Sequence, residues 1–400
     1  MYYVLLLFFV LEYIRPGSYL PALNVLHLNS LIPAALALAS FSSGQALAAL
    51  HQRNIYLLFA LLGLIGVSVL TADVTLYSFN VFTTVLGYAV MTFVLSALVD
   101  DARKMGGVLL TLVLVHIVVA ALTPEMITNP ESRHYVASGA FLGDGNDFAL
   151  SVNIVLPFCL FLAASARHAI AKLFYLVAAL FLVFCIVATQ SRGGTVALAC
   201  VAAYYWLKSG KKVMMGALIG VAVLLVFLLA PTSYFGRMNQ MNTTEGSAKG
   251  RILAWQASMR MAADHPILGV GAGHFGVKYG VDYRPPSGER VPWQTAHSVY
   301  FLALGELGFP GLMLLMAVIA TNLLANRRVG AAVRKRGGPS AIRDLSLLAS
   351  LSASQIAFAS GGAFLSVLYY PHLYVLAGLQ SAARRVIEAQ YQPDEAEPMA

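Results

Sequence analysis

Long apolar stretches recur from one end of this chain to the other, and they limit its fold more than any other feature. Many approach the roughly 20 residues that a helix needs to cross the hydrocarbon core of a bilayer. Of the 400 residues, 59% are hydrophobic and 11% are charged, whereas roughly a quarter are charged in soluble proteins. The apolar runs are continuous and do not alternate, which favours helices over barrel strands. The sequence therefore predicts an all-α integral membrane protein.

Twelve apolar runs, each bounded by charged residues, Gly, Pro or Asn, are candidate transmembrane helices. They lie near residues 2–14, 28–45, 54–71, 76–98, 105–122, 147–165, 173–190, 194–207, 213–230, 297–325, 345–360 and 364–382. The first run lacks the basic leading region and the cleavage site of a signal peptide, so we expect a retained, short span. The expected organisation is nine spans in 1–230, one large external loop in 231–296, three spans in 297–382 and a tail in 383–400.

The basic residues indicate how these spans are oriented. If the N-terminus is cytoplasmic, alternate segments collect sixteen of the 26 Lys and Arg residues, while the opposite short loops hold only Arg15, Arg133 and Arg192. The sixteen are Arg53, Arg103, Lys104, Arg167, Lys172, Lys208, Lys211, Lys212, Arg327, Arg328, Arg334, Lys335, Arg336, Arg343, Arg384 and Arg385. Short cytoplasmic loops carry an excess of such residues, so both termini are predicted to be cytoplasmic.

Charge and cysteine content exclude several classes of function. The formal net charge of +8 does not indicate nucleic-acid binding, because the basic residues lie in short loops between spans. Cys159, Cys185 and Cys200 all fall inside predicted spans and are expected to be packing residues. The predicted outer face has no cluster of Asp or Glu with metal-ligand spacing, so the residues themselves do not indicate a metal site.

Arg192 stands between two apolar runs, in the stretch VATQSRGGTVAL (187–198), on the predicted outer face. Topology gives no reason for a basic residue there. One interpretation is an arginine whose head reaches the lipid headgroups, as often occurs at helix ends. The other interpretation is an anion-binding site.

The predicted external loop contains a second unexplained arginine and a glycine-rich run. Residues 249–263 are predicted to form an amphipathic helix with Ile252, Trp255 and Met259 on one face. Arg251 would lie in its first turn, where the helix macrodipole disfavours a cation. The glycine-rich run DHPILGVGAGHFG (264–276) follows no strand, so a nucleotide-binding loop is disfavoured, although its backbone amides could contribute to an anion nest.

His297 is the most informative of the nine histidines, because it stands at the outer start of the tenth predicted span. A histidine at a helix start is either a satisfied polar residue or a catalytic group, and position alone does not decide between them. Glu306 lies about two and a half turns further along the same span. We expect Glu306 to be buried, either protonated or as a polar partner to another helix.

Taken together, these motifs resemble the bacterial O-antigen ligase and polymerase superfamily. His297 and Ser298, followed after nine residues by Gly308 and Gly311, match its pattern of His, then Asn, Ser or Gln, then Gly-x-x-Gly. The segment from Arg251 to HPILGVGAGHF resembles the large periplasmic loop of that family, and SRGG (191–194) resembles its arginine motif. GDGNDFAL (143–150) is similar to a segment that opens the sixth span. The resemblance covers roughly residues 140–320.

The resemblance implies a glycosyltransferase C-like membrane enzyme of the bacterial inner membrane. Its donor would be a glycan on undecaprenyl diphosphate, its acceptor the lipid A-core oligosaccharide, and its active site periplasmic. The resemblance also implies that Arg192 and Arg251 bind the donor diphosphate and that His297 is the general base of a metal-independent, inverting transfer. Asn146, Asp147 and His274 are possible supporting residues, although Asn146 and Asp147 could instead cap the sixth helix.

Other functions stay open at this point. An O-antigen polymerase or a protein O-oligosaccharyltransferase of the same superfamily would share the chemistry. Polymerases often have a second large periplasmic loop, and protein-modifying relatives usually carry extra domains; neither feature is evident here. A transporter of lipid-linked glycans is disfavoured, because transporters place ionisable or helix-breaking residues near the bilayer midplane in repeated halves. Here the unexplained basic residues gather at the outer rim.

Overall fold

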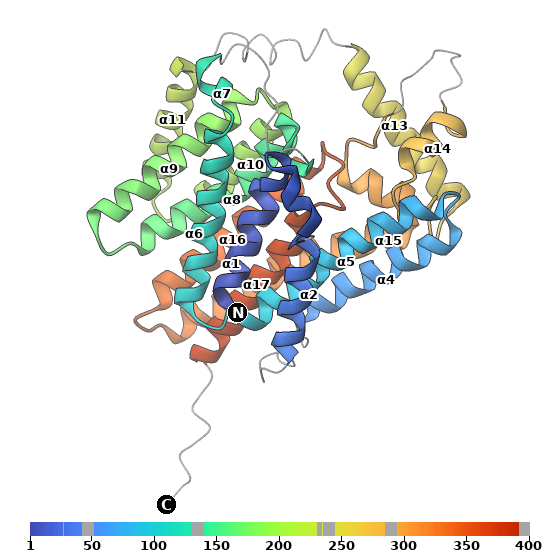
Figure 1. Ribbon diagram of the computed structural model, residues 1–400. Coiled ribbons are helices and arrows are strands. Elements are labelled where there is room, and N and C mark those ends of the chain that lie inside the picture. The colour runs from blue at the N-terminus through green and yellow to red at the C-terminus, as the bar shows by residue number, and fades with distance from the viewer. Residues whose placement is uncertain are drawn as a thin grey trace, which may run out of the picture.

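The computed structural model describes residues 1–26, 28–41, 52–129, 140–229, 234, 245–284 and 294–391 (Figure 1). The described part is helical throughout, with no strand. Its elements are α1 (Tyr2–Ile14), η1 (Pro16–Ser18), η2 (Pro21–Leu26), α2 (Leu28–Phe41), α4 (Arg53–Thr71), α5 (Thr75–Leu98), α6 (Ala102–Ala121), α7 (Glu125–Thr128), η3 (Ala140–Leu142), α8 (Gly145–Ser165), α9 (Ala169–Ala188), α10 (Arg192–Lys208), α11 (Lys212–Leu229), α13 (Glu245–Asp264), α14 (Phe275–Val281), α15 (Val299–Arg336), α16 (Ala341–Gly362) and α17 (Pro371–Tyr391).

Each of the twelve predicted spans overlaps one of these helices, and the predicted all-α membrane fold is confirmed. Within the described residues, six helices are both long and apolar enough to cross a bilayer: α4, α5, α6, α8, α9 and α15. Parts of the predicted organisation lie outside the described residues: the end of the second span (42–45), residue 230, the loop segments 231–233, 235–244 and 285–293, and the tail residues 392–400.

The last helices differ from the predicted spans in their limits. α17 begins at Pro371 and not at 364, because α16 ends at Gly362 and a turn-rich segment separates the two helices. α17 also continues to Tyr391, nine residues beyond the predicted span, and its buried positions there include Arg384 and Ile387. Hydropathy missed this extension because a polar side chain that packs against other helices scores like a solvated one.

Helix α8 is the most buried of the six membrane-crossing candidates. It packs against α16, α9, α6 and α10. Two serines of α16 bond to its backbone next to Pro157, since Ser350 Oγ donates to Pro157 O (2.9 Å) and Ser354 Oγ donates to Ile154 O (2.6 Å). Such interhelical hydrogen bonds fix helix positions inside a bilayer, where apolar burial does not favour one partner over another.

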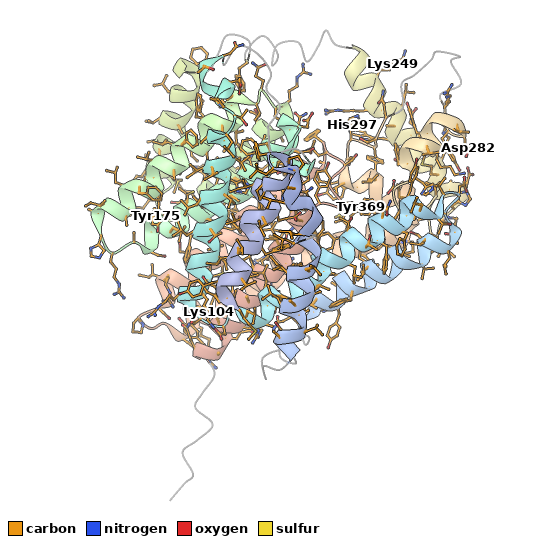
Figure 2. All side chains as sticks on the ribbon, viewed as in Figure 1. Lys104, Tyr175, Lys249, Asp282, His297 and Tyr369 are labelled. Atoms are coloured by element: carbon orange, nitrogen blue, oxygen red, sulfur yellow. The ribbon has the colours of Figure 1, made fainter. Side chains whose placement is uncertain are left out.

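The molecule has two distinct ends along its helix axes. Figure 2 shows Lys104 at one end, and Lys249 and His297 at the other. At the first end, Tyr2 Oη donates to Lys104 O (2.9 Å) and Arg385 donates to Ser96 O. We call this the terminal end, because α1 begins there and α17 finishes there (Figure 1).

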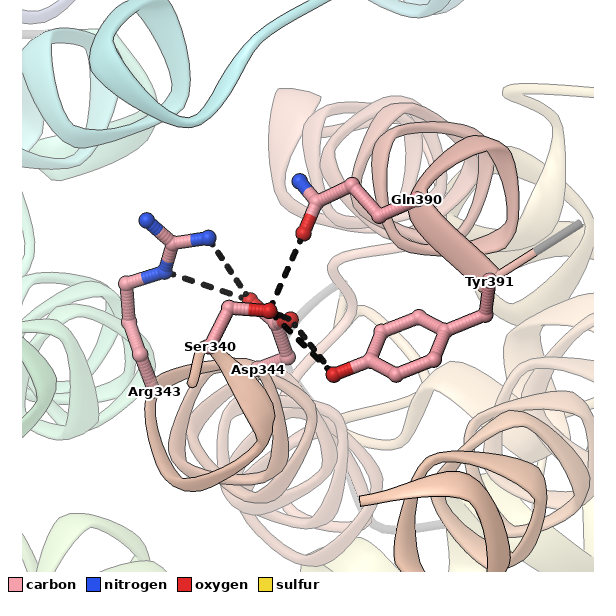
Figure 3. A network of polar contacts seen from close by, with 5 residues as sticks. All are labelled: Ser340, Arg343, Asp344, Gln390 and Tyr391. Atoms are coloured by element: carbon pink, nitrogen blue, oxygen red, sulfur yellow. Dashed lines mark hydrogen bonds and ion pairs between the residues drawn. The ribbon is translucent and has the colours of Figure 1, made fainter. Parts of the chain in front are cut away.

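A compact polar network fastens α17 to the α15–α16 turn at the terminal end (Figure 3). Asp344 accepts from Arg343 Nη2 (3.1 Å) and from Ser340 Oγ (2.7 Å), and Tyr391 Oη donates to the same carboxylate at 3.3 Å. Gln390 Oε1 lies 3.2 Å from Ser340 Oγ. Arg343 and Asp344 neutralise each other within this network, so its role is to stabilise the packing of α17.

Candidate active site

The first residues of α10 show why the stretch SRGG has its composition. Ser191 caps the helix, since its Oγ accepts a hydrogen bond from Gly194 N (3.0 Å). Gly194 lies so close to α8 that a Cβ there would meet Ala149 Cβ at 2.7 Å. Arg192 is the first residue of the helix, where the macrodipole disfavours a cation. The local fold therefore gives Arg192 no stabilising reason to be basic.

Helix α8 starts beside α10, and Asp144 is its N-cap. Asp144 Oδ1 accepts from both the backbone N and the side-chain Nδ2 of Asn146, each at 2.7 Å. Asn153 of α8 donates to Gly194 O (3.0 Å), which ties the starts of the two helices together. The alternative that Asn146 or Asp147 caps this helix is wrong, because Asp144 occupies that position. Asp147 lies in the first turn and accepts a long hydrogen bond from Tyr370 Oη (3.5 Å).

Helix α13 carries Arg251 and corrects two details of the sequence prediction. Because α13 begins at Glu245, Arg251 lies in its second turn, beyond the reach of the terminal dipole. The buried face includes Ala254 and Met261, whereas the predicted apolar residues Ile252 and Met259 are half exposed. The predicted helix is present, but its predicted packing face is wrong, because the buried face carries Ala254, Ala257 and Met261 instead of Ile252 and Met259.

Trp255 links α13 to the segment that holds His297. Its Nε1 donates to Ala296 O (3.1 Å), and its ring stacks on Phe301 with centroids 5.0 Å apart. His297 itself has φ of 46°, a left-handed conformation that costs a non-glycine residue on the order of 1–3 kcal/mol. Its half-buried ring has no hydrogen-bond partner among the described residues.

Arg251 lies within electrostatic reach of both Arg192 and His297. Burial lowers the pKa of Arg251, and the positive charge of Arg192 lowers it further. Burial also lowers the pKa of His297; the charge of Arg251 adds to this decrease and the charge of Asp144 opposes it. We call these four residues the arginine site.

The arginine site is arranged for a negatively charged ligand. Neither Arg192 nor Arg251 forms an ion pair within the described part of the chain, and the buried Nε of Arg192 has no hydrogen-bond partner there. Two half-buried guanidinium groups that repel each other are costly unless an anion binds between them. Guanidinium binds phosphate oxygens in a bidentate manner and does not lose its charge.

The glycine-rich run does form an anion nest, but the protein fills the nest itself. Glu306 Oε2 accepts from Gly273 N (2.8 Å) and its Oε1 accepts from Phe275 N (2.7 Å). Tyr369 Oη donates to the same carboxyl group at 2.6 Å. The expectation that Glu306 is a buried polar partner is thereby confirmed, and these amides are not available to a ligand.

The Gly-x-x-Gly motif allows the backbone of α15 to pack directly against the backbone of the glycine-rich run. Gly308 has φ of 67° and breaks the helix, and a Cβ there would meet Pro266 O at 2.5 Å. A Cβ on Gly269 would likewise meet Glu306 C at 2.3 Å. Phe309 N donates to Pro266 O (2.9 Å) across this contact. Only glycine permits so close an approach with this conformation.

His274 does not join the arginine site. Its Nε2 accepts from Val74 N (3.0 Å), so Nδ1 carries the proton and faces Ala272 O (3.1 Å) and Ser78 Oγ (3.2 Å). Fully buried, it holds the glycine-rich run against the α4–α5 turn. These contacts give His274 a structural role in this part of the fold.

A comparison with protein families points to one of them. A family model described as O-antigen ligase matches residues 176–316, a range that contains Arg192, Arg251, His297 and the Gly-x-x-Gly motif. Over this range the chain is similar to the O-antigen ligase family. The O-antigen ligase match indicates a glycosyltransferase-like function of the ligase or polymerase type in a multi-pass membrane protein. No curated protein matches the chain.

Sequence reasoning missed two residues that the structure adds to this site. Asp144 influences His297 and caps α8, and its signal was the run Asp-Gly-Asn directly before an apolar stretch, which is typical of a helix start. Tyr370 reaches Asp147 from the segment between α16 and α17, which lies more than two hundred residues away in sequence. No local pattern could have predicted that contact. Within the described ranges, no group of three or more His, Cys, Asp or Glu side chains is placed to hold a metal ion.

Proposed function

We propose that this protein is an O-antigen ligase, which transfers polysaccharide from undecaprenyl diphosphate to the lipid A-core oligosaccharide on the periplasmic face. The observation that carries the proposal is that Arg192 acts electrostatically on Arg251, and Arg251 on His297, with no carboxylate bonded to either guanidinium in the described part. The family match supports the same class of reaction.

In the proposed reaction, a hydroxyl oxygen of the acceptor attacks the anomeric carbon of the donor sugar. The bond between that carbon and the diphosphate oxygen breaks, and undecaprenyl diphosphate leaves with the electron pair. Arg192 and Arg251 stabilise the charge that develops on the leaving group. One direct displacement inverts the configuration at the anomeric carbon, and no cofactor is required.

His297 accepts the proton of the attacking hydroxyl in this proposal. A general base must be neutral before it reacts, and the neighbouring Arg251 lowers the pKa of His297, which favours the neutral form. Asp144 acts in the opposite direction and stabilises the protonated imidazolium once the proton has moved. Arg251 and Asp144 thus have opposite effects on the pKa of His297, whose ring must both accept and release a proton.

Reconstitution tests the proposal directly. The purified protein in lipid nanodiscs is incubated with undecaprenyl-diphosphate-linked glycan and lipid A-core, with a chelator and without nucleotide. A covalent glycan–lipid A-core product supports the ligase. If the donor is consumed into longer lipid-linked chains, the protein is the polymerase, and if no covalent product forms, the proposal is wrong and transport becomes the alternative.

A cellular assay separates the related activities. In a strain that carries His297→Ala, we expect the lipopolysaccharide ladder to disappear on a gel while the lipid-linked precursor accumulates. Retention of a single repeat on the core would contradict ligation and indicate the polymerase. Loss of glycan from a protein, with an unchanged lipopolysaccharide ladder, would indicate a protein O-oligosaccharyltransferase.

A further inference from the structure

Trp255 stands one helical turn after Arg251 on α13 and reaches the residue directly before His297. The two side chains of α13 are four positions apart, so they lie on the same side of the helix. The indole Nε1 of Trp255 donates to Ala296 O at 3.1 Å, and Ala296 itself is fully buried. One side chain therefore connects the helix that carries Arg251 to the backbone next to His297.

The carbonyl group that Trp255 binds belongs to the peptide plane that sets the conformation of His297. The φ angle of His297 describes rotation about its N–Cα bond, and the planar peptide unit before that bond contains the carbonyl of Ala296. With φ of 46°, His297 is in the left-handed region, which residues with a Cβ rarely adopt. Because α15 begins at Val299, a return to negative φ has to turn this plane and move Ala296 O away from Nε1.

The ring of Trp255 makes a second contact on the other side of His297. It stacks on Phe301, in the first turn of α15, with ring centroids 5.0 Å apart and ring planes 9° apart. Ser298, the N-cap of α15, forms no side-chain cap bond, so the usual capping contact does not fix the start of this helix. Trp255 therefore holds the chain both before and after His297.

We infer that Trp255 is a positioning residue, which holds His297 in its left-handed conformation and in place relative to Arg251 through the Nε1–Ala296 hydrogen bond. The inference rests on the proposed function, in which His297 is the base and Arg251 binds the diphosphate. In that displacement the attacking hydroxyl and the leaving diphosphate lie on opposite sides of the anomeric carbon, so the base and the arginine must keep a fixed spacing. Misplacement by about 1 Å can cost 10²-fold in rate.

A second hydrogen bond holds the same segment, but it does not act on the peptide plane. Ser366, between α16 and α17, donates from its Oγ to Thr295 Oγ1 at 3.0 Å, two residues before His297. This bond joins two side chains and is exposed, so water replaces it readily. Ser366 therefore provides a control for Trp255, because it secures the segment without fixing the conformation of His297.

The pH dependence of transfer distinguishes positioning from a general loss of stability. Among the described residues, Arg251 of α13 lowers the pKa of His297 and Asp144, ahead of α8, raises it, while Arg192 of α10 acts on Arg251. If His297 is no longer held beside Arg251, its pKa rises toward the ordinary value, and the acid limb of the pH–rate profile moves to higher pH. A variant that only unfolds more readily loses rate without moving that limb.

Replacement of Trp255 by benzothienylalanine in the full-length protein isolates the hydrogen bond. Sulfur takes the place of the indole N–H, so the donor is lost while the shape of the ring and its stacking are kept. In the reconstituted assay we expect kcat to fall about tenfold or more, with the KM for the lipid-linked donor within about twofold of wild type and the acid limb at higher pH. A kcat within about twofold of wild type, or an acid limb that does not move to higher pH, overturns the inference.

Three ordinary substitutions complete the series. Trp255→Phe also keeps a ring and removes the donor, so it should behave as the benzothienyl protein does. Tyr2→Phe is the remote control, because it removes an aromatic hydroxyl that donates to a backbone carbonyl at the terminal end. Tyr2→Phe and Ser366→Ala should each keep kcat within about twofold of wild type. A loss in Ser366→Ala as large as that in Trp255→Phe overturns the inference, since any loosening of the segment would then suffice.

A spectroscopic measurement separates the failure of this inference from the failure of the proposed function. In protein with isotope-labelled histidine, the Cα resonance of His297 is identified by its absence in His297→Ala. The benzothienyl protein should shift this resonance, because the Cα chemical shift depends on φ. If wild type transfers no glycan, the proposed function fails, and the resonance still decides the role of Trp255. An unmoved resonance overturns the inference whether or not transfer occurs.

Discussion

Two places in this molecule concentrate positive potential, and they differ in what neutralises it. The backbone amides of Gly273 and Phe275 point at one carboxyl group, which the chain itself supplies as Glu306. Arg192 and Arg251 lie together without an ion pair in the described ranges. The first place is closed and structural. The second is open in the described part of the chain, and in our proposal its charge binds the donor diphosphate.

The cost of each arrangement explains the difference. A buried group that loses its partner costs about 1–3 kcal/mol, so a nest that supports the fold must be filled at all times. An arginine pair at the edge of the membrane retains access to water until a ligand arrives, and its repulsion is relieved by binding. The comparison predicts that substitutions of Arg192 or Arg251, the open place, abolish transfer. Substitutions in the Glu306 nest, the closed place, should instead unfold the protein.

The largest effect on the transfer rate is expected at His297, the proposed base beside the arginine pair. His297→Ala should reduce the transfer rate by roughly 10²–10⁴-fold in the reconstituted assay, because proton removal by a positioned base contributes that much. His265→Ala is the control, since this exposed histidine lies at the other side of the glycine-rich run. If His297→Ala keeps more than a third of the wild-type rate, His297 is not the base.

Substitutions of the two arginines should have the next largest effect on the transfer rate. Arg192→Ala and Arg251→Ala should each lower the transfer rate by roughly 10²–10³-fold, because each removes a group that stabilises the leaving diphosphate. The lysine variants should recover only part of the rate, because an ammonium group does not bind phosphate in a bidentate manner. Lys249→Ala, an exposed cation on the same helix as Arg251, should leave the rate within about twofold of wild type. A similar loss in Lys249→Ala would mean that only net charge matters.

The closed place should respond in stability. Glu306→Ala leaves the Gly273 and Phe275 amides and the Tyr369 hydroxyl without an acceptor, so we expect a loss on the order of 3 kcal/mol. Thermal unfolding in detergent measures this as a clearly lower Tm. Glu306→Gln should lose less, because the amide oxygen still accepts. A Glu306→Ala protein with wild-type Tm and no activity would reverse the roles of the two places.

The smallest effect concerns pH. The rate should fall as the pH drops through the folded pKa of His297, which burial and Arg251 hold below its ordinary value of 6.5. The negative charge of Asp144 raises that pKa, so Asp144→Asn should move the acid limb of the pH–rate profile to lower pH. Asparagine also caps helices well, which keeps α8 intact. A shift to higher pH, or none, would show that Asp144 does not act on His297.

Much of the fold followed from continuous hydrophobicity, because a bilayer tolerates only helices whose backbone groups are satisfied internally. The end of α17 did not follow, since polar residues such as Arg384 are buried between helices there. Hydropathy records whether a residue prefers water, and it carries no information about which neighbour satisfies a polar side chain.

The site could be predicted in part. Arg192 and His297 attracted attention because nothing local explains them, and the structure brings both to Arg251. The role of His274 could not be read from its place beside the glycines, because the α4–α5 turn that buries it is two hundred residues away. Glu306 as the occupant of the nest, and Asp144 as a neighbour of His297, likewise depend on long-range packing.

The most direct test of the central claim is the binding of undecaprenyl diphosphate to the protein in nanodiscs. The double variant Arg192→Gln/Arg251→Gln should raise the Kd by roughly 10²-fold, because two charge-assisted contacts are lost. Glu306→Gln should bind as the wild type does, since its nest is occupied by the chain. An unchanged Kd in the double variant, or a Kd raised only by Glu306→Gln, would contradict the claim that the open arginine pair is the diphosphate site.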